Sequence, residues 1–567
     1  MDRRTVIAFA LIGLILILMP YYMQFFQGDE PQSPDPVKKT APRQIEPAQI
    51  TDTHPEPQPA QQPETQPAPV QDKSPATTST FQARDVVIDA ELYRAVISTR
   101  GGVITSWQLK SYFDRNGNWL ELIPSNGAGL GATVASESLN GLEFTPDRDR
   151  LEIHGDTQDL IVFRAQSPRG PVEKRFRFQG NRYRIHVSVI AEGLTRDDKL
   201  AISWDGSLAD TENKRGTSES FYEGVYEQIV TYMGGEVETW DTDRLQEKET
   251  PPSGQLTWIG IRNKYFLAAI IPNEGRYDLA LYGDNKTDPF GFSYRDFAFD
   301  MYADSGLNII NYSAYIGPIS YDILRAQNRD LDGLERELDL DDFVDYGPYF
   351  VRSILKPVTI LILKAFLAMH ALVPNYGVVI ILFSILVKVV VFPLTHKSLE
   401  STAKMQTLQP KIAEIRERYS SDQKKMNESM MKLYREEKIN PIGGCLPMLL
   451  QMPILFSLFS LFRGTIELRQ AGFAFWITDL SQPDTIPIGG FDLHLLPLLM
   501  GVSMFIQQKM MMKDPKQAIL VYIMPVFLTY IFWSMSSGLV FYYTLYNVLT
   551  LAQQIIMEKT KSMLGTS

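Results

Sequence analysis

The chain has 567 residues, of which 44% are hydrophobic, and a formal net charge of −11 that is unevenly distributed. Residues 81–350 hold 28 lysines and arginines against 44 aspartates and glutamates, whereas the rest of the chain holds 27 against 22. The chain therefore combines an acidic domain with an apolar part that has a basic fringe. The acidic charge argues against nucleic acid as a direct partner of that domain. The single cysteine, Cys445, excludes an intramolecular disulfide and a cysteine-cluster metal site, and we expect no metal and no cofactor.

The N-terminus reads MDRRTVIAFALIGLILILMPYYMQFF, in which Arg3 and Arg4 precede enough apolar residues to span a bilayer. We interpret residues 1–26 as an uncleaved transmembrane anchor with its N-terminus in the cytoplasm; a cleaved signal peptide is the alternative. Residues 27–80 are rich in proline and glutamine and cannot bury a core, which predicts an extended linker.

Residues 81–335 contain many short β-type runs. The run YRIHVSV (183–189) alternates apolar and polar residues, and turn signals such as QGN (179–181) separate such runs. Because helical periods do not intervene, the pattern predicts an all-β sandwich.

Residues 336–374 lead from this domain to the membrane. Their apolar part, KPVTILILKAFLAMHALV (356–373), carries two lysines and a histidine. We predict an amphipathic helix that lies at the outer interface, with a full membrane span as the alternative.

Five apolar segments follow, at 376–394, 446–462, 494–508, 519–533 and 539–557. With the anchor they predict six spans and two cytoplasmic termini, with a five-span core over 375–558 and a short tail over 559–567. The loop 395–440 holds ten lysines and arginines against seven acidic residues, whereas the loop 463–492 holds two arginines against four acidic residues. Both loops obey the positive-inside rule in this orientation.

The cytoplasmic segment 395–440 is predicted to form a helical hairpin. Leu408, Ile412 and Ile415 recur at helical spacing, and a second apolar stripe follows a turn, so the two helices should pair as an antiparallel coiled coil. The hairpin is either a structural loop or a surface for partners, since flexible methionines suit varied apolar segments. The candidate contact residues are Met426, Met430, Met431, Lys424 and Lys425.

Lys388 lies inside the apolar run ILFSILVKVVVFPLTHKSLE, where an ammonium at the bilayer centre costs about 2.5–3.5 kcal/mol on insertion scales. Snorkelling of its stem to the headgroups is one explanation. The five segments contain no aspartate or glutamate to pair with it, but they contain neutral polar residues such as Gln451 and Gln507. Together these residues fit a hydrated groove open to the cytoplasm. The missing acids weigh against an ion-coupled solute transporter, which stays as the alternative function.

Three motifs resemble the YidC membrane protein insertases of Gram-negative bacteria: NPIGGCLPMLLQMPILFSLF (440–459), ELRQAGFAFWITDLS (467–481) and SSGLVFYYTLYNVLTLAQQ (536–554). The region 376–558 is also similar to the wider family of mitochondrial Oxa and chloroplast Alb insertases. This resemblance implies a multi-pass protein of the bacterial inner membrane with a periplasmic β domain. It implies an insertase and not an enzyme. No G-x-x-x-x-G-K-[ST] loop occurs in the sequence, so we expect no nucleotide hydrolysis. A periplasmic sugar-modifying enzyme is a third hypothesis.

The resemblance also implies a substrate groove in the inner leaflet. Its cationic residue, usually arginine, matches Lys388; Ser384 matches a groove position one turn away; and Tyr542 and Tyr543 match an aromatic pair that meets the substrate. Nascent membrane proteins, the Sec translocon, the ribosome and the lipid bilayer are the implied partners. Because the tail is short, ribosome contact is expected through the two cytoplasmic loops.

Overall fold

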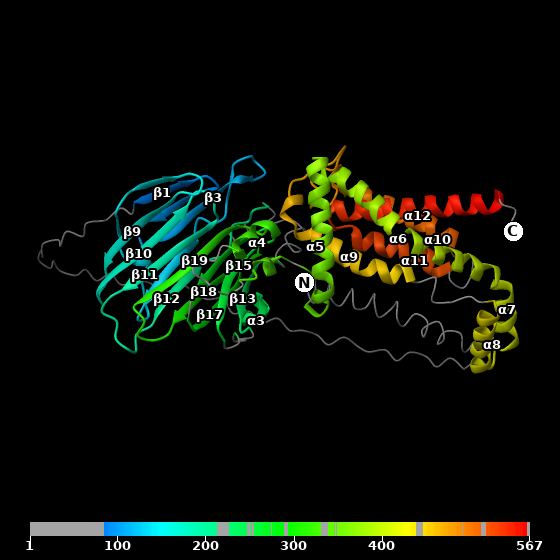
Figure 1. Ribbon diagram of the computed structural model, residues 1–567, viewed down its shortest axis with the longest axis horizontal. Helices are drawn as coiled ribbons and strands as arrows, with labels where there is room; N and C mark the ends of the chain where they lie inside the picture. Colours follow the sequence, from blue (N-terminus) through cyan, green and yellow to red (C-terminus); the bar gives the residue numbers. More distant parts are fainter. Residues whose placement is uncertain are drawn as a thin grey trace, which may run out of the picture. The chain divides into compact units, whose positions relative to one another are not determined.

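The structure is a computed structural model, and it describes residues 84–563 apart from 213–225, 247–250, 252–253, 274, 288–292, 330–337, 345, 347–348, 438–445, 490 and 512–517 (Figure 1). The predicted anchor (1–26) and linker (27–80) therefore lie outside the described residues.

The predicted all-β domain is present as two large sheets (Figure 1). The first contains β1 Asp85–Ala90, β2 Tyr93–Ser98, β3 Val103–Phe113, β4 Trp119–Glu121, β5 Ala128–Val134, β6 Glu137–Ser138, β8 Arg150–Ile153, β12 Leu200–Asp205, β17 Tyr277–Thr287 and β18 Ser293–Ala303. The second contains β7 Thr145–Pro146, β9 Gln158–Gln166, β10 Pro171–Gln179, β11 Arg184–Ala191, β13 Gln228–Met233, β14 Glu236–Trp240, β15 Leu256–Arg262, β16 Phe266–Pro272 and β19 Ile309–Pro318.

The strand order of the first sheet is β17-β18-β12-β5-β3-β2-β1-β8, with β4 on β3 and β6 on β5. The order of the second is β14-β13-β15-β16-β19-β11-β10-β9-β7. Two short helices accompany the sheets, α3 Thr242–Gln246 and α4 Tyr321–Arg329. Neighbouring strands of the second sheet are antiparallel, as expected of a sheet built from short strands and turns.

The alternation along β11 shows why these strands form a sandwich. Ile185, Val187 and Val189 are buried in the core, and the residues between them face the other side of the sheet. The core draws on both sheets, since Trp107 of β3 and Phe176 of β10 belong to one cluster of buried residues. Burial of these apolar faces holds the two sheets together.

The second half of the chain is helical: α5 Tyr349–Leu372, α6 Tyr376–Thr407, α7 Gln409–Arg418, α8 Gln423–Glu436, α9 Leu446–Gly464, α10 Leu495–Met511, α11 Ala518–Phe532 and α12 Ser537–Met563. Each of the five apolar segments expected to cross the membrane coincides with a helix, namely α6, α9, α10, α11 and α12. A small hairpin of β20 Ile486–Ile488 and β21 Phe491–Leu493 precedes α10. The helix α6 continues well beyond the expected end of its span at residue 394.

Within the described residues, two helical segments are long and apolar enough to cross a membrane, Arg352–Leu372 and Tyr376–Pro393, and Val521–Phe532 is a shorter apolar helix. The first lies in α5, for which the sequence predicted an interfacial position. In Figure 1, α5 runs across the direction of α12 and not along it, which favours that position. The count of six spans stays a prediction.

The contacts between α6 and α12 define their relative direction. Phe383 packs near Tyr542 with ring centroids 6.1 Å apart, and further along both helices Gln553 Nε2 lies 3.5 Å from Thr395 Oγ1. Because both residue numbers rise together, the two helices run parallel to each other.

By the same reasoning α10 and α11 are antiparallel. Thr529 Oγ1 lies 3.5 Å from the carbonyl oxygen of Pro497, whereas Phe505 pairs with Tyr522 at 5.6 Å between ring centroids. One residue number falls as the other rises. A chain that crosses a membrane repeatedly must alternate in this way.

Large apolar side chains cover the outward faces of these helices. Val526 and Tyr530 of α11 are 70% and 79% exposed, and Val389 and Val390 of α6 and Ile556 of α12 are exposed as well. An exposed apolar face of this extent marks an interaction surface, and a bilayer is the environment that suits long apolar helices.

Candidate functional site

Lys388 lies on α6, about 18 Å along the helix from Tyr376 at 1.5 Å per residue. Its side chain is directed at α12, where Nζ donates a hydrogen bond to Thr550 Oγ1 at 2.8 Å and lies 4.9 Å from the ring centroid of Tyr546. Lys388 is 8% exposed, and among the described residues no carboxylate pairs with it. A hydroxyl and an aromatic face therefore hold this cation.

Gln451 of α9 and Tyr542 of α12 extend the site toward a third helix. Gln451 Nε2 lies 3.2 Å from the Tyr542 hydroxyl, and the Tyr542 ring stacks on Tyr546 at 6.2 Å. Ser384, one turn before Lys388 on α6, is fully buried and donates its hydroxyl to the carbonyl oxygen of Ile380 at 2.7 Å. We call Ser384, Lys388, Gln451, Tyr542, Tyr546 and Thr550 the polar cluster.

The two remaining predicted site residues differ in their relation to this cluster. The Tyr543 ring lies 5.4 Å from the ring of Tyr542 and packs against Phe532 of α11 at 5.5 Å. Gln507 lies on α10, and in the described part of the chain no hydrogen bond joins it to the polar cluster. The structure thus brings together five of the residues that the sequence had selected, namely Lys388, Ser384, Gln451, Tyr542 and Tyr543.

The sequence interpretation did not select Tyr546 and Thr550, although both touch Lys388. Residues four apart on a helix share a face, and Tyr542, Tyr546 and Thr550 follow one another at this spacing. That spacing was the available signal.

Several buried polar atoms of α9, α10 and α12 have no hydrogen-bond partner among the described residues. Buried polar groups in proteins are nearly always bonded to protein or to ordered water, so we expect water among these helices. The atoms are Gln451 Oε1, Ser457 Oγ, Gln508 Oε1, the Tyr543 hydroxyl oxygen, Gln553 Oε1 and both side-chain polar atoms of Gln554.

The helices α7 and α8 form the hairpin, and they divide the predicted contact residues into two groups. Met426 is buried, and Met430 packs against a small core formed by Leu408 and Ile412. In contrast, Met431 is 48% exposed.

The two lysines of the hairpin are also exposed. The Lys424 side chain is exposed, and Lys425 pairs with Asp422 at 3.3 Å at the start of α8. The side chains that the hairpin offers to a partner in this conformation are therefore Met431, Lys424 and Lys425. Among the residues that the structure describes, no group of three or more His, Cys, Asp or Glu side chains could hold a metal ion.

The fold and the site fit a membrane protein in which a β-sandwich precedes a helical domain with a lysine in its polar interior. Residues 85–361 match the family described as "YidC periplasmic domain", and residues 368–563 match "60Kd inner membrane protein".

Relatives named "Membrane protein insertase YidC" extend the match to nearly the whole chain. The one from Chlorobium luteolum is 32% identical over 592 residues and covers 99% of this chain and 96% of its own. The relative from Chlorobaculum parvum is 31% identical and covers 99% of this chain and 95% of its own. The relative from Pelobacter propionicus is 33% identical and covers 86% of this chain and 89% of its own. This chain belongs to the YidC family.

Proposed function

We propose that this protein is a membrane protein insertase of a bacterial inner membrane, which moves hydrophobic segments of nascent proteins from the cytoplasm into the bilayer. Its relatives carry the name of insertases over almost the whole length of this chain. The observation that carries the mechanism is the buried Lys388, which has a hydroxyl partner and no carboxylate among the described residues.

The topology that we propose has six spans, cytoplasmic termini, an outer interfacial α5 and a periplasmic β-sandwich. Parallel α6 and α12 support it, because three further spans between them return the chain to the same direction. The antiparallel pair α10 and α11 fits the same alternation.

In the proposed mechanism, the polar cluster lines a hydrated groove that opens to the cytoplasm. A polar, often acidic, segment of the client enters this groove and is attracted to Lys388, which lowers the cost of moving that segment across. The apolar segment of the client then partitions into lipid, and its burial supplies the driving force without nucleotide hydrolysis.

Tyr542 is fully buried between α6, α9 and α12 in the described conformation. If the client meets this ring, as the family resemblance implies, α9 must first move away from α12. The hydrogen bond between Gln451 and Tyr542 is the contact that such an opening breaks. Tyr543, the next residue on α12, would then lie on the lipid side of the path by which the client leaves the groove.

We further propose that the protein acts alone or beside the Sec translocon, assists the folding of its clients, and meets the ribosome through its cytoplasmic loops. The exposed Met431, Lys424 and Lys425 of the hairpin support a contact with a partner of mixed apolar and acidic character.

The test is insertion of a small membrane protein into proteoliposomes that contain the full chain. A client with an acidic translocated tail should insert about 10-fold or more slowly into vesicles with Lys388→Met, since a charge-assisted hydrogen bond contributes about 1.5–3 kcal/mol. A client with a neutral tail should be affected less. Lys388→Arg should restore the acidic client.

Lys364 offers a matched control, because it lies exposed on the apolar α5, away from the polar cluster. Lys364→Met should leave both clients unchanged. Equal insertion of both clients by Lys388→Met would show that the electrostatic step is wrong. Uptake of small solutes by the same vesicles without insertion would favour the transporter alternative.

A further inference from the structure

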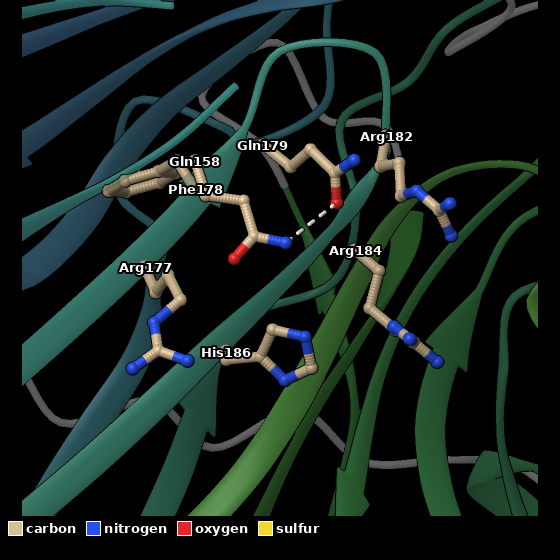
Figure 2. A pocket seen from close by; sticks show the side chains of 7 residues that line it. All are labelled: Gln158, Arg177, Phe178, Gln179, Arg182, Arg184 and His186. Atoms are coloured by element: carbon tan, nitrogen blue, oxygen red, sulfur yellow. Dashed lines mark hydrogen bonds between the residues drawn. The ribbon is translucent and has the colours of Figure 1, made fainter. Parts of the chain in front are cut away.

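A basic depression on the second sheet of the β-sandwich has no part in the proposed insertion step. It has a volume of about 230 Å³, including the open solvent at its mouth. Figure 2 shows the side chains that surround it. Its polar lining residues come from β9, β10, β11 and the turn between the last two, namely Gln158, Arg177, Gln179, Arg182, Arg184 and His186. Three are arginines and none carries a carboxylate.

The register of the sheet places the side chains of Arg177 and His186 beside each other. Arg177 of β10 lies directly opposite His186 of β11, so both side chains occupy the same face. His186 Nδ1 lies 3.0 Å from Ser313 Oγ on the next strand, β19, and this contact orients the imidazole ring. In Figure 2 the ring stands between the guanidinium groups of Arg177 and Arg184.

The neighbouring arginines of the same sheet differ from Arg177 in their charge compensation. Arg164 pairs with Glu173 at 2.9 Å, and Arg175 binds the other oxygen of the same carboxylate. Arg177, two residues further along β10, has no ion-pair or hydrogen-bond partner among the described residues. The guanidinium charge of Arg177 can therefore be met by an anion that enters the depression.

The amide groups complete the wall of the depression. Gln158 Nε2 donates to Gln179 Oε1 at 3.3 Å, and Gln179 Nε2 donates to Asp156 Oδ1 at 3.4 Å. The Asp156 carboxylate is thereby engaged with an amide. The Gln158 oxygen remains as an acceptor, and Figure 2 shows it directed toward the space between Arg177 and His186.

We propose that this depression binds a phosphoryl group, either in a phospholipid headgroup or in a soluble phosphate. Guanidinium groups donate paired hydrogen bonds to oxyanions. Donors from two strands surround one space, which suits a tetrahedral group with four oxygens better than a planar carboxylate. The Gln158 oxygen can accept a hydrogen bond from a protonated phosphate oxygen or from a neighbouring hydroxyl group.

The test is calorimetric titration of the full chain in a maltoside detergent, which carries no phosphate. Inorganic phosphate should bind saturably and raise the unfolding temperature, and acetate should bind far more weakly. Arg177→Gln should weaken phosphate binding about 10- to 100-fold, the range for one charge-assisted contact. His186→Gln, a second variant on the same face, should also weaken it.

Arg175→Gln is the matched control, because Arg175 is also exposed on β10 but does not line the depression. It should change phosphate binding less than twofold. The proposal is overturned if the wild-type chain does not bind phosphate saturably, if acetate binds equally well, or if the two arginine variants lose the same affinity.

A short-chain lipid separates the two sources of the phosphoryl group. Dihexanoyl phosphatidylglycerol, used below its micelle concentration, should bind at least 10-fold more tightly than inorganic phosphate if the ligand is a headgroup. Weaker or equal binding of this lipid supports a soluble phosphate at the same site. Both readouts are independent of insertion activity, so they test this site and not the proposed function.

Discussion

Replacing Lys174 by methionine should remove a pH dependence from the unfolding free energy of the β-sandwich. Lys174 lies on β10 with no exposed surface, and its Nζ donates hydrogen bonds to the carbonyl oxygens of Gly101 at 2.9 Å, Gly102 at 3.2 Å and Leu130 at 3.1 Å. Burial lowers the pKa of Lys174 to about 7 from its ordinary value of 10.5.

Between these two pKa values the unfolded chain holds a proton at Lys174 that the folded protein has largely released. The folded state therefore gains stability as the pH rises from about 7 to 10.5, and below about pH 7 this contribution no longer changes. One pKa unit corresponds to 1.36 kcal/mol, so the full gain across the window is about 5 kcal/mol.

The assay is urea unfolding of the full chain in detergent, followed by tryptophan fluorescence, because Trp107, Trp240 and Trp258 are buried in the β-sandwich. Between pH 7.5 and 9.5 the wild type should gain about 1.4 kcal/mol per pH unit relative to Lys174→Met. Lys199→Met is the control, since Lys199 is partly exposed and pairs with Asp278 at the surface.

At a fixed pH near 7, Lys174→Met has two opposing effects. It leaves three buried carbonyl oxygens without their donor, which costs about 1–3 kcal/mol for each group left unsatisfied, and it removes the cost of burying an ammonium. The slope against pH is therefore the informative quantity. If wild type and Lys174→Met have the same slope, Lys174 does not lose its proton in this window and the reasoning fails.

Two further substitutions test individual contacts. Thr550→Val should destabilise the helical domain by about 1–3 kcal/mol in thermal unfolding, because it removes the hydroxyl that accepts from Lys388 Nζ; Thr544→Val, which loses only a bond within its own helix, should cost less. Gly101→Ala should destabilise the β-sandwich in urea by about 1–3 kcal/mol more than Gly117→Ala. Both glycines have φ near +80°, but a Cβ at Gly101 would lie 2.9 Å from backbone atoms whereas Gly117 faces open space, so equal losses would contradict this clash.

The helices of the core could be predicted because each is encoded locally. An apolar run of sufficient length specifies a helix in a membrane without reference to the rest of the chain, and α6, α9, α10, α11 and α12 all lie where such runs occur. Lys388 could be selected for the same reason, because a charged residue inside an apolar segment is visible in the local sequence.

What the sequence did not reveal depends on pairing between distant segments. Thr550 is 162 residues from Lys388, and nothing in either helix alone specifies that they meet. The strand order of the β-sandwich is non-local in the same way, since β11 pairs with β19, more than a hundred residues later. Lys174 sits at an inward position of the alternation along β10, but its carbonyl partners come from two other parts of the first sheet.

Two of the buried lysines, Lys174 and Lys388, differ in the number of N–H groups that they use. An ammonium has three, and in its protonated form Lys174 donates all three to backbone carbonyl oxygens, which leaves none for another partner. Lys388 donates one to Thr550 and places its charge near the Tyr546 ring. Its remaining donors have no acceptor among the described residues and can meet water or the acidic segment of a client. This difference, and not burial alone, is the physical reason why we propose a function for Lys388 and a structural role for Lys174.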